Sequence, residues 1–230
     1  MIFGMMTRRN KVKPDFKLAY TKANIILVTS ETIASFPFSS QKLIKEKTGI
    51  RCRSYKKAKE YGVDIRDFGS ESAVLIGYHG KLIIFYDDTK PITHINFSNL
   101  HELGHSDMGH KKCDEHNELY DKQEVEANAY AAQILMPEQL LRYLQHQGVR
   151  ITIPFLVENF GVSETAAEKR IKTLANTNEE WRSRAEKEYD DIILERYLPL
   201  IQHLCPRNQF DYEEEFNMQR ERDGWNSRRW

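Results

Sequence analysis

His101-Glu102-Leu103-Gly104-His105 is the stretch that decides the architecture, because it fits the pattern His-Glu-x-x-His. On a helix, side chains four residues apart share one face, so His101 and His105 can both point at one ion about 2 Å from each ring nitrogen. Glu102 is turned by about 100° from His101, which places its carboxylate beside that ion, where it can take a proton from an attacking water. We therefore expect a zinc site with His101 and His105 as ligands and Glu102 as the catalytic base.

Two histidines do not complete a zinc site, so the neighbouring sequence must supply a third ligand. His110 lies one residue out of register for the longer pattern HExxHxxGxxH, and we interpret it as a helix-end histidine whose charge suits the helix dipole. Cys113 and His116, in the loop that follows, are further candidates. The next helix offers better ones, in the segment Glu124-Val125-Glu126-Ala127-Asn128.

Helical geometry favours Glu124 over Glu126 as the third ligand. At 100° per residue, Glu124 shares a largely apolar face with Asn128, and that face should turn towards the interior and the metal. Glu126 falls on the other side with Gln133, which predicts that it either faces solvent or supports the ligands from behind. Asn128, one turn beyond Glu124, can orient His101 by a hydrogen bond.

Glu124 also has a structural alternative. Asp121 and Glu124 could form a capping box at the start of the helix, in which Glu124 only satisfies backbone amides. The two interpretations differ in one measurable property, because only a ligand lowers zinc affinity when it is replaced by alanine.

The composition is that of a globular chain. The 230 residues are 40% hydrophobic, 30% charged and 11% aromatic, and a disordered chain would carry fewer aromatic and branched aliphatic residues. We find no apolar run near the ~18 residues of a membrane span and no secretory signal. Three widely spaced cysteines (Cys52, Cys113 and Cys205) exclude a disulfide framework and a zinc site built from cysteines alone. The expected compartment is the cytoplasm.

Charge is balanced overall but unevenly distributed. The chain has 34 basic and 34 acidic residues, yet residues 1–62 hold 14 Lys and Arg against 4 Asp and Glu. This basic third could contact nucleic acid or an acidic partner. We favour the simpler interpretation, in which it complements the acidic remainder of the same chain.

The periodicity predicts an α+β protein with a small antiparallel sheet and a mostly helical remainder. Residues 73–78 and 81–86 are rich in β-formers and are joined by His79-Gly80, which indicates a tight hairpin. A further short strand is expected at 50–54. The predicted helices span about 15–35, 40–48, 55–61, 96–110, 121–136, 138–147, 154–160, 163–175 and 178–204. We divide the chain into a basic tail (1–14), a catalytic core (15–137), a helical C-terminal region (138–205) and a C-terminal tail (206–230).

Residues 154–174 have the spacing of a helix-turn-helix pair around Gly161-Val162-Ser163. A DNA-reading helix would carry basic residues at its start, but Glu164 and Glu168 stand there, with Arg170 and Lys172 further on. We therefore expect this pair to pack on the catalytic core or on the substrate, and direct DNA binding is the less favoured alternative.

In combination, these motifs resemble the ImmA/IrrE metallopeptidases. The resemblance covers roughly residues 15–175 and departs from the usual pattern just before the motif, where Asn99-Leu100 stands. It rests on the HELGH sequence, the Glu-x-Glu-Ala-Asn-x-aromatic-Ala-Ala segment from 124 to 132, Leu135-Met136-Pro137, the strand from 80 to 87 and Phe160-Gly161-Val162-Ser163.

The resemblance implies a zincin-like (gluzincin-like) core that binds Zn²⁺ through His101 and His105, with Glu102 as the base. It also implies an endopeptidase whose protein substrate is a helix-turn-helix repressor of a phage or mobile element. A rival hypothesis is a regulatory or DNA-binding protein that keeps the fold only as a scaffold. A toxin-associated protease module is a third.

In such a fold, residues 81–87 would form the strand nearest the catalytic helix. An extended substrate could then pair along the edge of that strand, which presents a scissile carbonyl without demanding particular side chains. The residues predicted to bind substrate in this way are Lys81, Leu82, Ile83, Ile84 and Phe85.

Overall fold

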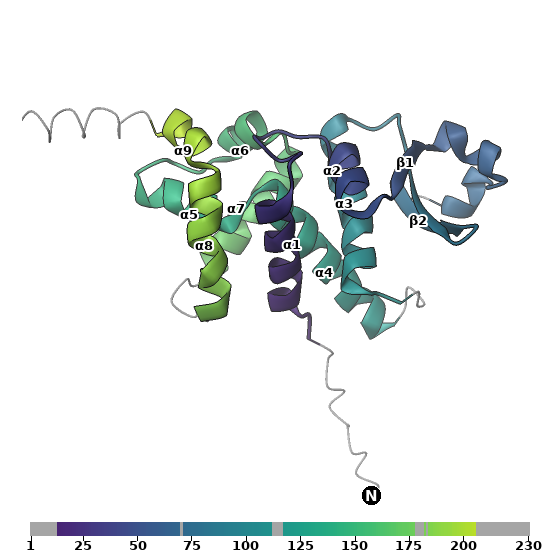
Figure 1. Ribbon diagram of the computed structural model, residues 1–230, viewed down its shortest axis with the longest axis horizontal. Coiled ribbons are helices and arrows are strands. Elements are labelled where there is room, and N and C mark those ends of the chain that lie inside the picture. The colour runs from purple at the N-terminus through teal and green to yellow at the C-terminus, as the bar shows by residue number, and fades with distance from the viewer. Residues whose placement is uncertain (1–12, 70, 112–116, 178–181, 183, 206–230) are drawn as a thin grey trace, which may run out of the picture.

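The computed structural model describes residues 13–69, 71–111, 117–177, 182 and 184–205 (Figure 1). The predicted tails therefore lie almost wholly outside the described residues, as do Cys113 and His116. The helices are α1 (Phe16–Thr29), α2 (Ser40–Thr48), α3 (Ile92–Met108), α4 (Glu118–Leu135), α5 (Glu138–His146), α6 (Ile153–Phe160), α7 (Glu164–Asn176), α8 (Arg184–Arg196) and α9 (Leu198–Leu204). The strands are β1 (Arg51–Ser54), β2 (Ala73–Tyr78) and β3 (Lys81–Tyr86), and two 3₁₀ helices are η1 (Tyr55–Tyr61) and η2 (Ile65–Phe68).

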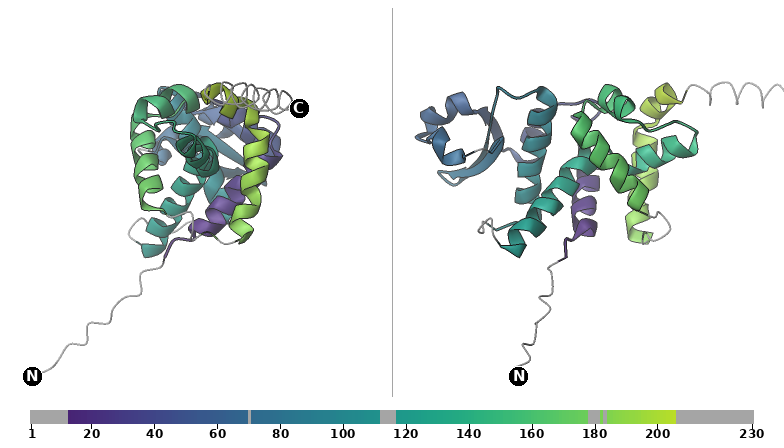
Figure 2. Two further views of the ribbon diagram at one scale, coloured as in Figure 1. Left: turned by 90° about the vertical axis from the view of Figure 1, so that its left-hand side faces the viewer. Right: turned by 180° about the vertical axis from the view of Figure 1, so that it is seen from behind.

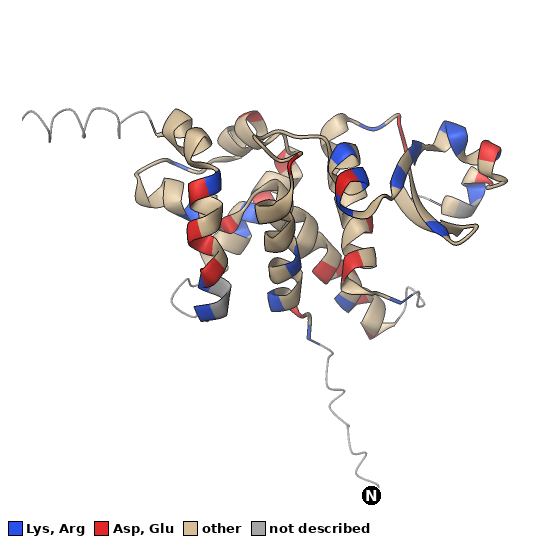
Figure 3. Ribbon diagram, viewed as in Figure 1, with Lys and Arg blue, Asp and Glu red and all other residues tan. Residues whose placement is uncertain are grey.

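The fold is mixed α+β and mostly helical. The sheet and the 3₁₀ helices occupy one end, α1, α3 and α4 stand in the middle, and α5 to α9 gather at the end opposite the sheet, as the view from behind also shows (Figures 1 and 2). Lys and Arg residues of the N-terminal third concentrate on α2, β1 and η1 (Figure 3). Within the described residues, no helix combines the length and apolar character needed to cross a membrane.

The sheet has the strand order β1-β3-β2, which corrects two sequence-based expectations. It is not purely antiparallel, because β1 runs parallel to β3 while β2 and β3 form the hairpin around His79 and Gly80. From Ile83 to Tyr86, β3 is paired on both sides and has no free edge. The prediction that Lys81, Leu82, Ile83, Ile84 and Phe85 form the substrate-binding edge is therefore wrong for the last three of these residues, and β2 is the edge on the side away from β1.

Helix boundaries follow local capping. The first helix ends at Thr29 rather than near residue 35, and α4 begins at Glu118 because the Asn117 side chain accepts a hydrogen bond from the Leu119 N–H. That cap removes the capping-box alternative for Asp121 and Glu124, which lie inside the helix. Of the long C-terminal helix predicted from 178 to 204, residues 178–181 and 183 lie outside the described residues, and the part from Arg184 onwards is two helices that meet at Tyr197, with a proline in the first turn of α9.

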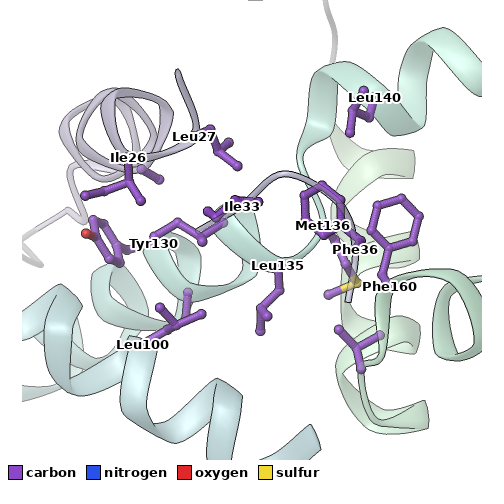
Figure 4. Close-up of a cluster of buried hydrophobic side chains, with 14 of the residues drawn as sticks. Ile26, Leu27, Ile33, Phe36, Leu100, Tyr130, Leu135, Met136, Leu140 and Phe160 are labelled. Carbon is purple, nitrogen blue, oxygen red and sulfur yellow. The ribbon is translucent and has the colours of Figure 1, made fainter. Parts of the chain in front are cut away.

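A single apolar cluster joins the central helices to the C-terminal ones. Leu100 of α3 and Tyr130 of α4 are fully buried in it, together with Leu27 of α1 and Phe160 of α6 (Figure 4). The smaller second cluster lies between the sheet and the 3₁₀ helices around Phe85. Helices α3 and α4 pack in the first cluster, which also contains Ile84 of β3, so this one cluster fixes the elements that carry the candidate site.

Helices α3 and α4 approach closely at Gly104. A Cβ placed on Gly104 would lie 3.1 Å from Cδ1 of Tyr130 and 3.2 Å from Cα of Ala127, closer than ordinary carbon contacts. Only a residue without a side chain allows this spacing. The glycine of the HELGH motif therefore sets the distance between the two helices.

The helix-turn-helix pair is α6 and α7, joined through Gly161 and capped by Ser163. Arg170 of α7 is 2% exposed and donates hydrogen bonds to the Met136 carbonyl, the Gln133 amide oxygen and the Tyr20 hydroxyl. The guanidinium that could have contacted a phosphate is thus directed into the core.

Candidate metal and catalytic site

Three side chains with metal-binding chemistry meet between α3 and α4. His101 and His105 lie one turn apart on α3, and Glu124 faces them from α4. The Nε2 atoms of the two histidines are 2.9 Å apart, and the Glu124 carboxylate oxygens lie 3.3 Å from His101 Nε2 and 3.2 Å from His105 Nε2. Each of the three residues is partly buried, so the cluster borders solvent. The structure thus brings together the three residues that the sequence nominates as ligands.

The spacing of these three groups suits a small tetrahedral ion. Donor atoms bound about 2.1 Å from such an ion lie about 3.4 Å from one another. Two imidazole nitrogens and one carboxylate oxygen are also a donor set that zinc uses in catalytic sites, with a fourth position left for water or substrate. The residues present therefore fit the metal that the sequence motif implies.

Glu102 lies beside this cluster and not within it. Its Oε2 accepts a hydrogen bond of 2.9 Å from the N–H of Leu75 in β2, which fixes the carboxylate between α3 and the sheet. Burial raises the pKa of Glu102, although nearby His101 and His105 oppose the rise. The position agrees with the 100° turn between adjacent helical residues.

Asn128 stands one turn after Glu124, and its Oδ1 is 3.1 Å from Nδ1 of His101. An Nδ1–H of His101 can donate to this amide oxygen, which leaves Nε2 free to face the metal position. For the other α4 glutamate we expected a side chain that either faces solvent or supports the ligands from behind, and the structure excludes the first alternative. Glu126 is 2% exposed and does not face solvent, and Gln133 on the same side is fully buried.

The physical reason is the packing of α1 on α4. Helix α1 packs along the side that carries Glu126, and the backbone N–H of Asp15 donates to Glu126 Oε1 at 2.5 Å. The Glu124 side, which we expected to be the interior, is the one that borders solvent, since Glu124 is partly buried and Asn128 is exposed. Further along the same face Ala131 and Leu135 are buried, so the apolar-face argument held there but not at Glu124 and Asn128, although Glu124 does meet the histidines.

His110 is the residue that sequence reasoning missed. It is not a solvated helix-end cation, because its side chain is only 8% exposed and contacts His105 and Glu126. Burial, with a further contribution from His105, lowers the pKa of His110. A signal was available in Gly109, since a glycine directly after a helix often reverses the chain and returns the next residue to the last turn.

Electrostatics within the cluster favour a charged carboxylate. Hydrogen bonds from His101 and His105 hold the pKa of Glu124 far below its usual range. Burial acts against protonation of His101, but the hydrogen bond to Glu124 and its negative charge outweigh burial and raise the pKa of His101. Glu124 is therefore ready to serve as an anionic ligand.

A groove of about 900 Å³ lies between the hairpin turn and the C-terminal half of α3. Its walls include Tyr78, Leu82, Leu103 and Ser106, the last being the residue after His105. None of the three candidate ligands lines this groove. We therefore do not place the reacting bond in it.

The family comparison identifies the central part of the chain. The model of Peptidase_M78, described as the IrrE N-terminal-like domain, matches residues 58–172, which contain α3, α4 and the whole hairpin. No curated protein matches the chain.

Proposed function

The chain belongs to the Peptidase_M78 family, and from that premise we propose that it is a zinc-dependent endopeptidase with a zincin-like core. The observation that carries the proposal is the meeting of His101, His105 and Glu124 within hydrogen-bonding distance of one another, beside the Glu102 carboxylate that the Leu75 N–H holds. Membership of this family supports the assignment of peptidase activity. The donor set supports zinc, because three N and O ligands with an open fourth position are typical of catalytic zinc.

When bound, zinc would polarise the scissile carbonyl and make a water more acidic. The chain's own residues perform the remaining steps. Glu102 accepts the proton of the attacking water at its carboxylate and passes it to the leaving amine. Its fixed position, held by the Leu75 N–H, orients the proton acceptor before substrate arrives.

We propose that substrate pairs along the outer edge of β2. Leu75 donates its N–H to Glu102 and not to β3, so this N–H lies on the outer edge of the strand, next to α3. An extended peptide on that edge would pass in front of the metal ligands, which is where a scissile bond is needed. Main-chain pairing would present the bond with little dependence on side chains.

The proposed substrate is a helix-turn-helix repressor of a phage or mobile element. The sequence resemblance described above supports it. A scaffold that binds DNA through α6 and α7 is the rival, and two observations weigh against it. Arg170 is buried in the core, and Lys172 forms a 2.7 Å ion pair with Glu168 on the surface of α7.

The test uses the purified full chain, with a helix-turn-helix repressor encoded beside its gene as substrate. We expect about one equivalent of zinc and cleavage that a chelator stops and added zinc restores. Glu102→Gln should keep the zinc and abolish cleavage, since an amide preserves shape but does not accept the proton. Equal zinc content with undiminished cleavage in this variant would refute the assignment of Glu102. Specific DNA binding without cleavage would support the scaffold.

A further inference from the structure

We propose that His110 and Glu126 form a buried positioning pair that holds the ring of His105 for metal binding, and that the start of α1 anchors this pair. The inference rests on the proposed function, because it requires an ion at His101, His105 and Glu124. Neither His110 nor Glu126 would touch the ion. Both act through His105.

The backbone places His110 against the ligand. After α3 ends at Met108, Gly109 adopts a left-handed conformation with φ of 68°. The N–H of Gly109 then donates to the Ser106 carbonyl, and the N–H of His110 donates to the His105 carbonyl at 3.0 Å. This pair of bonds closes a helix and turns the second residue after it back onto the last turn, here onto His105.

The side chains continue that connection. His105 Nδ1 lies 3.0 Å from His110 Nδ1, and His110 Nε2 lies 3.0 Å from Glu126 Oε2. If His105 offers the Nε2 lone pair to an ion, its proton sits on Nδ1 and donates to His110 Nδ1. His110 then carries its own proton on Nε2 and donates it to Glu126. With the protons placed in this way, the His105–His110 contact and the His110–Glu126 contact each have one donor and one acceptor. No other placement of the protons achieves this and also leaves Nε2 of His105 free.

Glu126 is fixed in turn by the beginning of the chain's first helix. Its carboxylate, 3% exposed at the side chain, accepts the Asp15 N–H at 2.5 Å and lies 3.6 Å from Nζ of Lys122. A buried carboxylate without such partners would be costly, so these contacts explain how Glu126 tolerates its place beneath α1. The ring of His110 is thus held at both nitrogens, and its orientation determines that of His105.

The rival explanation is packing alone, in which His110 and Glu126 only fill space between α1, α3 and α4. Two conservative variants separate the explanations. In His110→Asn, the amide oxygen can occupy the place of Nδ1 and accept from His105, but the link to Glu126 is lost. In His110→Gln, the amide nitrogen can reach Glu126 as Nε2 does, but the acceptor for His105 is lost. Glutamine is closer to histidine in size.

The experiment measures zinc affinity of the full chain by competition with a chromophoric chelator, and the absorption spectrum of the Co²⁺-loaded chain. Urea unfolding without metal monitors the fold. We expect His110→Gln to weaken zinc binding by about 10- to 100-fold, the range usual for groups that orient a ligand, and to alter the cobalt spectrum. The zinc affinity of His110→Asn should lie between that of His110→Gln and that of the unmodified chain. His203→Asn, on the exposed face of α9, controls for the loss of a histidine and should change neither readout.

Each outcome is decisive. Unmodified chain that binds no zinc refutes the proposed function and, with it, the role of the pair. Tight zinc binding by the unmodified chain and equally tight binding by His110→Gln refutes the positioning pair alone. Better binding by the glutamine variant than by the asparagine variant favours packing and also refutes it. If His110→Gln does not fold, Glu126→Gln replaces it, with the same expectation of weaker zinc binding.

Discussion

Replacing Gly104 by alanine tests whether the spacing of α3 and α4 sets the metal site. The new methyl group would lie 3.1 Å from Cδ1 of Tyr130 and 3.2 Å from Cα of Ala127. The ring of Tyr130 cannot easily turn aside, because it is fully buried and its hydroxyl donates to Asp107. Ala127 Cα belongs to the backbone. The helices themselves must therefore separate, by about 0.4 Å if carbon atoms are to return to their usual contact distance.

The magnitude follows from two opposing effects. Overpacking of this kind lowers the free energy of unfolding by about 1–3 kcal/mol. Alanine in place of glycine inside a helix raises it by about 1 kcal/mol. The free energy of unfolding should thus fall by about 0–2 kcal/mol, and the variant should fold. Zinc affinity should respond more strongly, because a site tolerates errors of only about 0.2 Å in its ligand distances. Separation of His105 from Glu124 beyond that tolerance should weaken zinc binding at least about 10-fold, or about 1.4 kcal/mol.

Urea unfolding without metal and competitive zinc titration measure the two quantities on the same protein. Gly104→Ser should be worse than Gly104→Ala in both assays, since it adds a further atom in the same direction. The reasoning from Gly104 would be wrong if the alanine variant were more stable than the unmodified chain and bound zinc equally well. Helices α3 and α4 would then accommodate the methyl group without separating.

Three further predictions concern metal, pH and the core. Zinc at 100 times its dissociation constant should stabilise the chain by about 2.7 kcal/mol, and Glu124→Ala should lose this gain, as thermal unfolding with and without a chelator will show. Burial of Glu46 opposes its charge, but hydrogen bonds from Thr32, Glu31 and Ser30 outweigh burial and lower its pKa from 4.5 to about 2. Stability from this carboxylate is therefore complete above pH 4.5 and is lost as the pH falls towards 2. The difference in free energy of unfolding between the unmodified chain and Glu46→Gln, measured with urea, should shrink over that interval. A constant difference would contradict the assignment. Arg170→Met should destabilise the fold by about 2–4 kcal/mol, because three acceptors, two of them buried, lose a charged donor, and an unchanged free energy of unfolding would contradict it.

Local signals in the sequence were sufficient for much of the fold. The two strands of the hairpin are marked by β-formers and its turn by Gly80, and Ser39, Thr152 and Ser163 each cap a helix in the structure. These features depend on residues close in sequence, which periodicity can register. The α+β character with a small sheet is the same kind of prediction, and the structure confirms it.

Long-range packing was not accessible in the same way. Nothing near Glu126 indicates that α1, more than a hundred residues earlier, covers it, and for this reason the sequence left open a solvent-facing alternative that the structure excludes. The parallel pairing of β1 with β3 likewise depends on contacts between distant segments, and it removed β3 from the edge of the sheet. The face of α4 chosen for Glu124 is buried at Ala131 and Leu135 but borders solvent at Glu124 and Asn128, and periodicity does not register such a change along one helix.

The sequence distances within the site have a consequence for the order in which the protein folds. His101, His105, Glu124 and Asn128 all lie on two consecutive helices, whereas the bond from Asp15 to Glu126 joins residues 111 positions apart. Contacts between neighbouring helices close short loops and form early, while contacts between distant segments close long ones and form late. Zinc offered during refolding should therefore be captured by a helical hairpin that α1 has not yet covered, and docking of α1 should then convert weak early binding into the tight binding of the native protein.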